Sequence, residues 1–353
     1  FSRASRANMG LIWCQSKALG CPQFVRWGFA SSRAYGKLAA ELKELSGIDT
    51  GYAPTGGIIP CLGEAELEAR AQFIEKLRAE TEDGTYPASV LSRKELEGML
   101  PKVPFGPEVS GGIWSDMDGY VDPLHLMFAF RKSFVRLGGT LFAGERVSEV
   151  KPSGKGYAVV CGGRTLECGK AVLAAGLGVR KLAAQLGTDI PVFPNKSQVM
   201  LLERIPADVL PIPLLGIART FGGTVMIGAA HENMGMDRRL TPEVLAANAQ
   251  WAVRVWPELE RKRILRFWTG LRVWPKDAYP IYDRIPGHEN AFVFAMHSAV
   301  SLAAILEQAL PDYVMGKPLP PDGAIFGLSR FAGGGSGFQG SAASSPHAEA
   351  PNK

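Results

Sequence analysis

Two short apolar runs, far apart in the chain, constrain the fold more than any other feature. Residues 170–176 read KAVLAAG, residues 291–296 read AFVFAM, and a helical pattern soon follows each run. Apolar strands that lead into helices are typical of a parallel sheet covered on both faces. Between the two runs, residues 192–230 and 260–275 contain strand patterns with antiparallel-type alternation. The sequence therefore predicts a mixed α/β fold, in which an α/β nucleotide-binding core carries an inserted mixed-sheet domain.

Local signals predict several of the remaining elements. A helical pattern over residues 23–46 ends at Gly47, and Ser92 with Glu95 forms a capping box. Glycine-rich turns between short strands over residues 140–169 predict a three-stranded meander. A helix capped by Thr241 is expected to follow. Residues 332–353 are rich in Gly, Ser, Ala and Pro, so we expect a disordered tail.

Charge and cysteine usage narrow the class of protein. The net charge of +5 is spread along the chain, which argues against a nucleic-acid partner and favours solvated faces. The longest nearly apolar stretch, residues 291–306, is too short to span a bilayer, so no transmembrane segment is expected. We expect a cytoplasmic protein, or one peripheral to the inner membrane. The cysteines are odd in number and lack metal-ligand spacing, which predicts free thiols and no metal site: Cys14, Cys21, Cys61, Cys161 and Cys168.

Three segments could carry chemistry, and each has a plainer interpretation. The turn after residue 173 leaves backbone N–H groups open to a cofactor, or it is an ordinary strand-to-helix turn. Arg272 lies among tryptophans and apolar residues, where a guanidinium needs a carboxylate, from a ligand or from an internal salt bridge. His297 and Ser298 precede a helix N-terminus that could stabilise a reduced flavin, or His297 satisfies a turn.

Read together and in order, six segments resemble the FAD-dependent oxidoreductases of the D-amino acid oxidase family. The likeness is greatest to its branch of glycine oxidases, D-amino acid dehydrogenases and opine or hydroxyproline dehydrogenase-like enzymes, and it covers about residues 3–320. The segments are SRANMG near the start, DGYVDPLHLMFAF at 118–130, ERVSEV at 145–150, VLAAGLGVRKL at 172–182, FWTGLR at 267–272 and HSAVSLAA at 297–304.

The resemblance implies a role for each matching position. Arg272 corresponds to the arginine that holds the substrate carboxylate. Tyr279 and Tyr282 are candidates for the pocket rim, but a role in the core or on the surface is favoured for each. It also implies an FAD-binding Rossmann-like core from residues 1–50, 140–190 and 265–320, and a substrate domain from residues 51–139 and 191–264. The residues implied to contact FAD are Asn8, Met9, Gly10, Val147, Ala174, Ala175, Gly176, Gly270, His297, Ser298, Ala299 and Val300.

The sequence departs from the family pattern in two places. Such enzymes begin with a strand and a G-x-G-x-x-G turn, and neither precedes Phe1. The glycine-rich segment 333–340 lies in the low-complexity tail and does not replace that unit. We expect an N-terminal truncation of about 35 to 40 residues, the usual length of a βαβ unit, and weak or absent FAD binding without it. A second arginine soon after the histidine is also missing, because Ser298, Ala299 and Val300 follow His297.

The resemblance implies oxidation of a small amino or imino acid. Hydride would pass from the substrate Cα–H to flavin N5, and water would hydrolyse the imine product. The electron acceptor would be oxygen, a quinone or a partner subunit. Two alternatives are a non-catalytic truncated remnant or subunit that binds substrate or a partner without FAD, and a nicotinamide enzyme of the same fold class.

Overall fold

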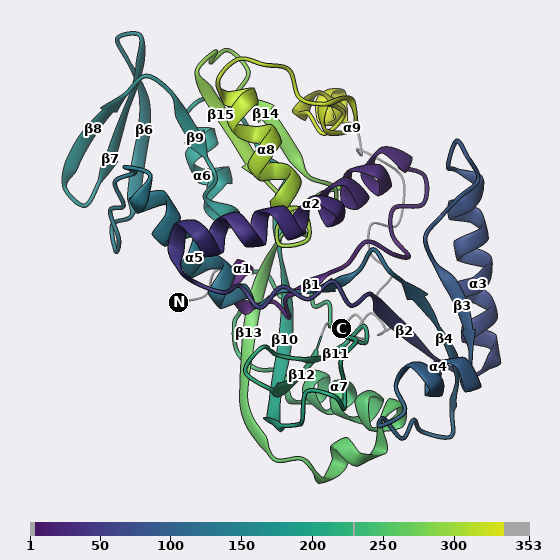
Figure 1. Cartoon of the computed structure of the whole chain (residues 1–353). Coiled ribbons are helices and arrows are strands. Elements are labelled where there is room, and N and C mark those ends of the chain that lie inside the picture. The colour runs from purple at the N-terminus through teal and green to yellow at the C-terminus, as the bar shows by residue number, and fades with distance from the viewer. Residues whose placement is uncertain (1–3, 229, 335–353) are drawn as a thin grey trace.

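The parallel pair predicted from the two apolar runs lies at one end of the molecule (Figure 1). The computed structural model describes residues 4–228 and 230–334. In it, β9 (Ala171–Leu173) runs parallel to β15 (Ala291–Ala295), and β14 (Ile281–Arg284) is antiparallel to β15. Every residue of β15 is buried, as expected. Val172 in β9 is 44% exposed, so the first run forms a shorter and less buried strand than predicted.

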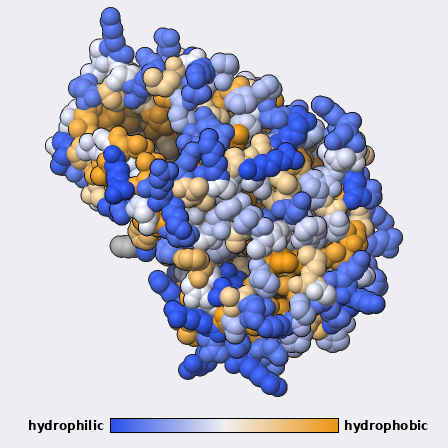
Figure 2. Space-filling view, in the orientation of Figure 1, coloured by the Kyte–Doolittle hydropathy of each residue, from blue (hydrophilic) through white to orange (hydrophobic). Residues whose placement is uncertain are grey.

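An apolar groove explains the exposure of Val172. It has a volume of about 640 Å³ and lies between β9, α5 (Pro123–Arg136) and α8 (Ala303–Val314). Phe130, Val172, Leu306 and Leu310 are among its lining side chains. Apolar side chains also gather on the face beside the meander in Figure 2. Within the described residues, β9 pairs only with β15, so its other edge is open beside this groove.

A long helix crosses the centre of the molecule (Figure 1). This is α2 (Pro22–Ser46), which packs against α5 and α8. It ends as predicted at Gly47, whose left-handed φ of 70° lets its N–H bond back to the carbonyl of Lys43. The meander is also confirmed as β6 (Val147–Ser153), β7 (Gly156–Cys161) and β8 (Arg164–Cys168).

A second sheet forms the lower part of the molecule in Figure 1. Its order is β11 (Ile217–Arg219), β12 (Thr224–Gly228), β10 (Val192–Arg204) and β13 (Ile264–Pro275). The helix α7 (Pro242–Val255) packs against β10 and β12. Since β10 and β13 are paired along most of their length, one sheet joins segments that the sequence assigned to different domains. The domain boundaries stay a prediction.

A smaller three-stranded sheet lies beside this one. It consists of β2 (Gly57–Leu62), β4 (Val109–Ser115) and β3 (Ser89–Ser92), with α3 (Glu64–Ala79) and α4 (Arg93–Met99) next to it. The capping box at Ser92 is confirmed. The other elements are α1 (Ala4–Ala7), β1 (Leu11–Ile12), β5 (Gly119–Tyr120), α6 (Val179–Ala184), α9 (Pro321–Ala324) and 3₁₀ turns at Gly176–Gly178, Pro257–Arg261 and Leu328–Gly334.

The expected cap at Thr241 is wrong, and the structure decides the place of two tyrosines. Thr241 precedes α7, but its hydroxyl donates to Glu232 instead of capping the helix. Tyr279 and Tyr282 are 0% and 1% exposed and pack with Phe326, so the favoured core role is confirmed and neither lies at a pocket rim. Their rings contribute more as buried apolar surface than they could at a wet rim.

Two further expectations concern the tail and the membrane. The predicted tail, residues 332–353, lies outside the described residues from 335 onward. Within residues 4–228 and 230–334, none of the helices is long and apolar enough to cross a membrane.

Candidate active site

The predicted segments meet along strand β13. Near its middle, a Cβ on Gly270 would lie 2.6 Å from the Cβ of Ala7, so glycine allows residues 4–10 to pack closely here. The indole of Trp268 donates to the Ala7 carbonyl at 3.0 Å. Further along, a Cβ on Gly176 would lie 3.4 Å from Val273. The first segment and the turn after β9 therefore both contact β13.

The segment from His297 to Ser301 joins the same region. The Trp274 and His297 rings have centroids 4.5 Å apart. The Ser301 hydroxyl accepts from the Trp13 N–H and donates to the Leu11 carbonyl, both at 3.2 Å. Residues 297–301 thus lie beside β13 and beside the chain that follows Gly10. Four segments that are far apart in the sequence converge here.

The predicted cofactor residues of the first segment are largely used by the fold itself. The Asn8 side chain accepts from the Gly10 N–H at 2.7 Å, and the Met9 side chain is buried against Tyr120. A Cβ on Gly10 would lie 2.1 Å from the Val121 carbonyl oxygen. Contacts within the fold therefore use the side chains of Asn8 and Met9, and the predicted role of these residues at a cofactor stays a prediction.

The other predicted contacts differ in exposure. Ala174 and Ala175 are exposed, and Gly176 takes a left-handed φ of 57°, so the turn after β9 presents only small groups. Val147 lies in the meander, packed on the same hydrophobic cluster as Val273. Ala299 and Val300 continue the segment after Ser298, and all three are half-buried.

Arg272 is half-buried, and neutral groups hold its guanidinium. Nη1 donates to Asn195 Oδ1 and to the Ala230 carbonyl, both at 2.9 Å, and Nη2 donates to Ser197 Oγ at 2.8 Å. Among the described residues, no carboxylate forms an ion pair with it. The internal salt bridge that the sequence left open is therefore absent from the part of the chain that the structure describes. Burial lowers the pKa of Arg272 to about 10, and the charge of Glu232 opposes this, so the side chain is a cation at neutral pH.

Two neutral imidazoles accompany this cation. Nδ1 of His231 lies 3.0 Å from Asn195 Oδ1. The His231 ring packs edge-on against Trp274, with the two ring centroids 5.2 Å apart. Burial, and then the charge of Arg272, lower the pKa of His231 to about 3. Burial also lowers the pKa of His297 well below its usual value, followed by the charges of Arg272 and Lys17 and by His231. Arg272 therefore keeps a full positive charge beside uncharged, partly apolar rings.

Sequence reasoning missed Asn195, Ser197 and His231. In the ladder, Asn195 lies opposite Arg272 and Ser197 lies opposite Gly270, so both side chains are on the face of the sheet that carries the guanidinium. The sequence did contain a signal for Asn195 and Ser197, because these two small polar residues occupy alternate positions of a strand pattern that continues into an apolar run. His231 gave no signal, because only the loop after β12 brings it to β13.

A second pair of buried charges was also missed. Lys196 and Glu232 form an ion pair at 3.1 Å, with side chains 1% and 4% exposed. Thr241 Oγ1 accepts from Lys196 and donates to Glu232, and Gln198 donates to the other carboxylate oxygen, each at 2.7 Å. This network fixes the loop that carries Ala230 and His231 against β10.

Comparison with known proteins identifies the family. The model of the FAD dependent oxidoreductase (DAO) family matches residues 1–306. The chain belongs to this family. It is 32% identical over 330 residues to an opine oxidase subunit of Rhizobium meliloti, covering 93% of this chain and 88% of that protein. It is 25% identical to glycine oxidase of Geobacillus kaustophilus, covering 94% and 88% of the two chains. The crystal structure of a glycine oxidase from Geobacillus kaustophilus superposes with a TM-score of 0.85 over 94% of this chain and 90% of that chain, at 25% identity.

Membership in this family makes the chain an FAD-dependent oxidoreductase, and the described residues fit part of the cofactor. The turn at Ala174 and Ala175 exposes only methyl groups, and Gly176 follows them in a left-handed conformation. The helix α8 begins after residues 297–302, and the fold itself satisfies part of its start, because Ser31 Oγ accepts from the Ile305 N–H at 3.4 Å. The small groups at the turn after β9 suit the approach of a large planar ring system.

Proposed function

We propose that this chain oxidises a small amino or imino acid whose carboxylate is bound by Arg272. The observation that carries the proposal is a half-buried guanidinium held by Asn195 and Ser197, with no carboxylate ion pair among the described residues. A charge left without a counter-ion in such a place is costly, whereas a carboxylate ligand would be bound through charge-assisted hydrogen bonds. The substrate would supply the missing negative charge.

The surroundings of Arg272 favour a neutral substrate amine. Arg272 and Lys17 both act on His297 as positive charges, and His231 and His297 are themselves uncharged near neutral pH. A nearby positive charge disfavours an ammonium group and so lowers its pKa. Trp274 packs against both imidazoles and limits access of water on that side. The chain thus binds the carboxylate, orients the Cα and holds the amine uncharged without a strong protein base.

The cofactor supplies the redox chemistry. The turn at Ala174, Ala175 and Gly176 would lie against bound FAD, which would supply the acceptor for the hydride of the substrate Cα–H; water would then hydrolyse the imine product. The two similar proteins described above, the opine oxidase subunit and glycine oxidase, both carry the name of an oxidase, which agrees with this proposal.

Anaerobic reduction of the flavin tests this function. The full-length protein is purified with its flavin and mixed without oxygen with glycine, N-methylglycine, D-alanine or proline. At least one of them is expected to bleach the visible flavin absorbance, because each has a carboxylate and an α-hydrogen next to nitrogen. Methoxyacetate, which has no amine, is the matched control and should bind without bleaching. A folded but colourless protein, or a yellow protein that no amino or imino acid bleaches, would contradict the proposal and favour a non-catalytic role.

A further inference from the structure

Lys17 lies on an unusually constrained part of the backbone. It is in the loop between β1 and α2, and both of its neighbours have left-handed backbones, with φ of 54° at Ser16 and 63° at Ala18. Both neighbours are buried, at 1% and 0% exposure. A non-glycine residue in this region costs about 1–3 kcal/mol, and such residues concentrate at functional sites. The fold thus holds Lys17 in place against local preference.

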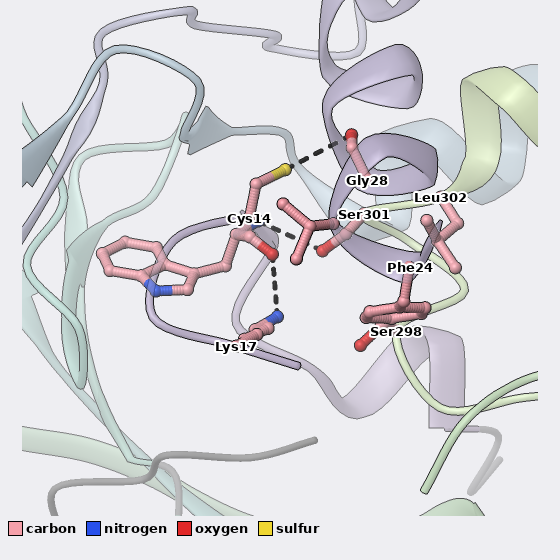
Figure 3. Close-up of a pocket in the computed structure, with 9 residues that line it drawn as sticks. Cys14, Lys17, Phe24, Gly28, Ser298, Ser301 and Leu302 are labelled. Carbon is pink, nitrogen blue, oxygen red and sulfur yellow. Dashed lines mark hydrogen bonds between the residues drawn. The ribbon is translucent and has the colours of Figure 1, made fainter. Parts of the chain in front are cut away.

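The same backbone conformation recurs across the cavity that Lys17 borders. Ser298, with φ of 63°, lines this cavity together with Lys17 and Trp13 (Figure 3). The cavity has a volume of about 10 Å³, room for one water-sized oxygen atom. Three of the four non-glycine residues that the structure describes with left-handed backbones therefore lie at or beside this small space.

The ammonium group of Lys17 has spare hydrogen-bonding capacity. Its Nζ donates to the Trp13 carbonyl at 2.7 Å, and no carboxylate within residues 4–228 and 230–334 forms an ion pair with it. Asp118 is nearby, but its carboxylate accepts from the backbone of Cys14 at 2.6 Å and from the side chain of Gln15 at 2.6 Å. A lysine ammonium has three donors, so at least one more acceptor can be bound.

Lys17 and Arg272 both act on His297. The charges of both side chains lower the pKa of that imidazole. Ser298 Oγ lies 3.0 Å from His297 Nδ1, so the residue bordering the Lys17 cavity also touches the imidazole that packs at a tilt against Trp274. The site thus contains two cations near one neutral ring.

We propose that Lys17 binds a second substrate carboxylate, so that the preferred substrate is a dicarboxylic amino or imino acid. One oxygen of that carboxylate would occupy the small cavity, within reach of Nζ. This inference rests on the proposed function, because it assumes that Arg272 holds the first carboxylate. It assigns Lys17 to substrate specificity, which is distinct from the redox step.

Binding of unreactive analogues tests the proposal. Oxydiacetate and methoxyacetate have an ether oxygen in place of the amine and differ mainly in one carboxylate; glutarate and butanoate are a second such pair without the ether. Dissociation constants are measured by calorimetry for the flavin-bearing parent, Lys17→Met, Lys17→Arg and the surface control Lys37→Met. Lys17→Met should weaken at least one diacid about 10- to 100-fold, as expected for loss of a charge-assisted hydrogen bond, and its monoacid less than about twofold. Lys17→Arg should restore part of the loss, and Lys37→Met should match the parent.

The outcomes separate this inference from the proposed function. If Arg272→Met weakens all four ligands but Lys17→Met changes each diacid and its monoacid by the same factor, the Lys17 proposal is overturned and the proposed function stands. If Arg272→Met changes none of them, or the parent binds none, both are overturned. If Lys17→Met does not fold, the proposal is tested by binding measurements on the unmodified protein. Each diacid is then compared with its own monoamide, and at least one diacid must bind about tenfold tighter, because equal binding in both pairs overturns the proposal.

Discussion

Lys196 and Arg272 are two cations on neighbouring strands of one sheet, and they differ in what balances their charge. Arg272 lies opposite Asn195 in the β10–β13 ladder, and Lys196 is the next residue of β10, so the two side chains leave opposite faces of the sheet. Lys196 has a built-in carboxylate, Glu232, at 3.1 Å. Arg272 has only neutral acceptors: Asn195, Ala230 and Ser197.

This difference distinguishes a structural charge from one that is available to a ligand. The Lys196–Glu232 pair is nearly inaccessible to solvent and forms hydrogen bonds with Gln198 and Thr241. It therefore stabilises the loop that carries His231. Arg272 is held in one orientation by groups that leave its charge uncompensated. Where the chain supplies the carboxylate, the cation maintains the fold, and where it does not, we infer that the substrate supplies it.

We expect the largest effect from removal of the carboxylate that pairs with Lys196. Glu232→Gln leaves Lys196 buried without a counter-charge, which should lower the free energy of unfolding by about 3–5 kcal/mol. Chemical denaturation measures this loss. Combining Glu232→Gln with Lys196→Met should restore most of the stability, because no uncompensated charge then remains.

A surface pair provides the matched control. Glu203 pairs with Arg263, whose side chain is 85% exposed, and solvent screens this pair, so Glu203→Gln should lower the free energy of unfolding much less than Glu232→Gln. If Glu232→Gln were as mild as Glu203→Gln, the Lys196 pair would not be the structural element that we describe.

A smaller effect, on stability at low pH, tests whether the charge of Arg272 acts on its neighbour His231. The pKa of His231 is about 3 in the folded chain, because burial and Arg272 disfavour its charged form. The unfolded chain binds a proton at the ordinary histidine value of about 6.5, so the contribution of His231 to stability is lost as the pH falls below that value. The loss should approach about 1.4 kcal/mol per pH unit between about pH 6 and pH 4.

Replacement of the histidine checks this assignment. His231→Gln should flatten the decline of unfolding free energy with falling pH, whereas His125→Gln, outside the site, should keep the parent profile. A variant at His231 that declines as steeply as the parent would show that Arg272 does not hold this imidazole neutral.

The sequence predicted the framework of the site better than its immediate surroundings. The buried strand at 291–295, the meander and the long helix ending at Gly47 follow from local patterns and are all present. Arg272 could be singled out because a guanidinium among tryptophans needs an anion. Its actual partners, Ser197 and the loop residue His231, could not be identified, since strand register and loop closure decide them. Thr241 was misread for a similar reason: its hydroxyl bonds to Glu232, which no local capping pattern reveals.

The affinity of Arg272→Met for a simple carboxylate tests most directly whether Arg272 holds the substrate. The flavin-bearing parent, Arg272→Met and Arg266→Met, an exposed arginine on the same strand, are titrated with methoxyacetate by calorimetry. We expect Arg272→Met to raise the dissociation constant about 30-fold or more, as for the loss of one partner of a buried charge pair, while Arg266→Met matches the parent. If a folded, flavin-bearing Arg272→Met protein binds methoxyacetate as tightly as the parent, then Arg272 does not hold the substrate carboxylate.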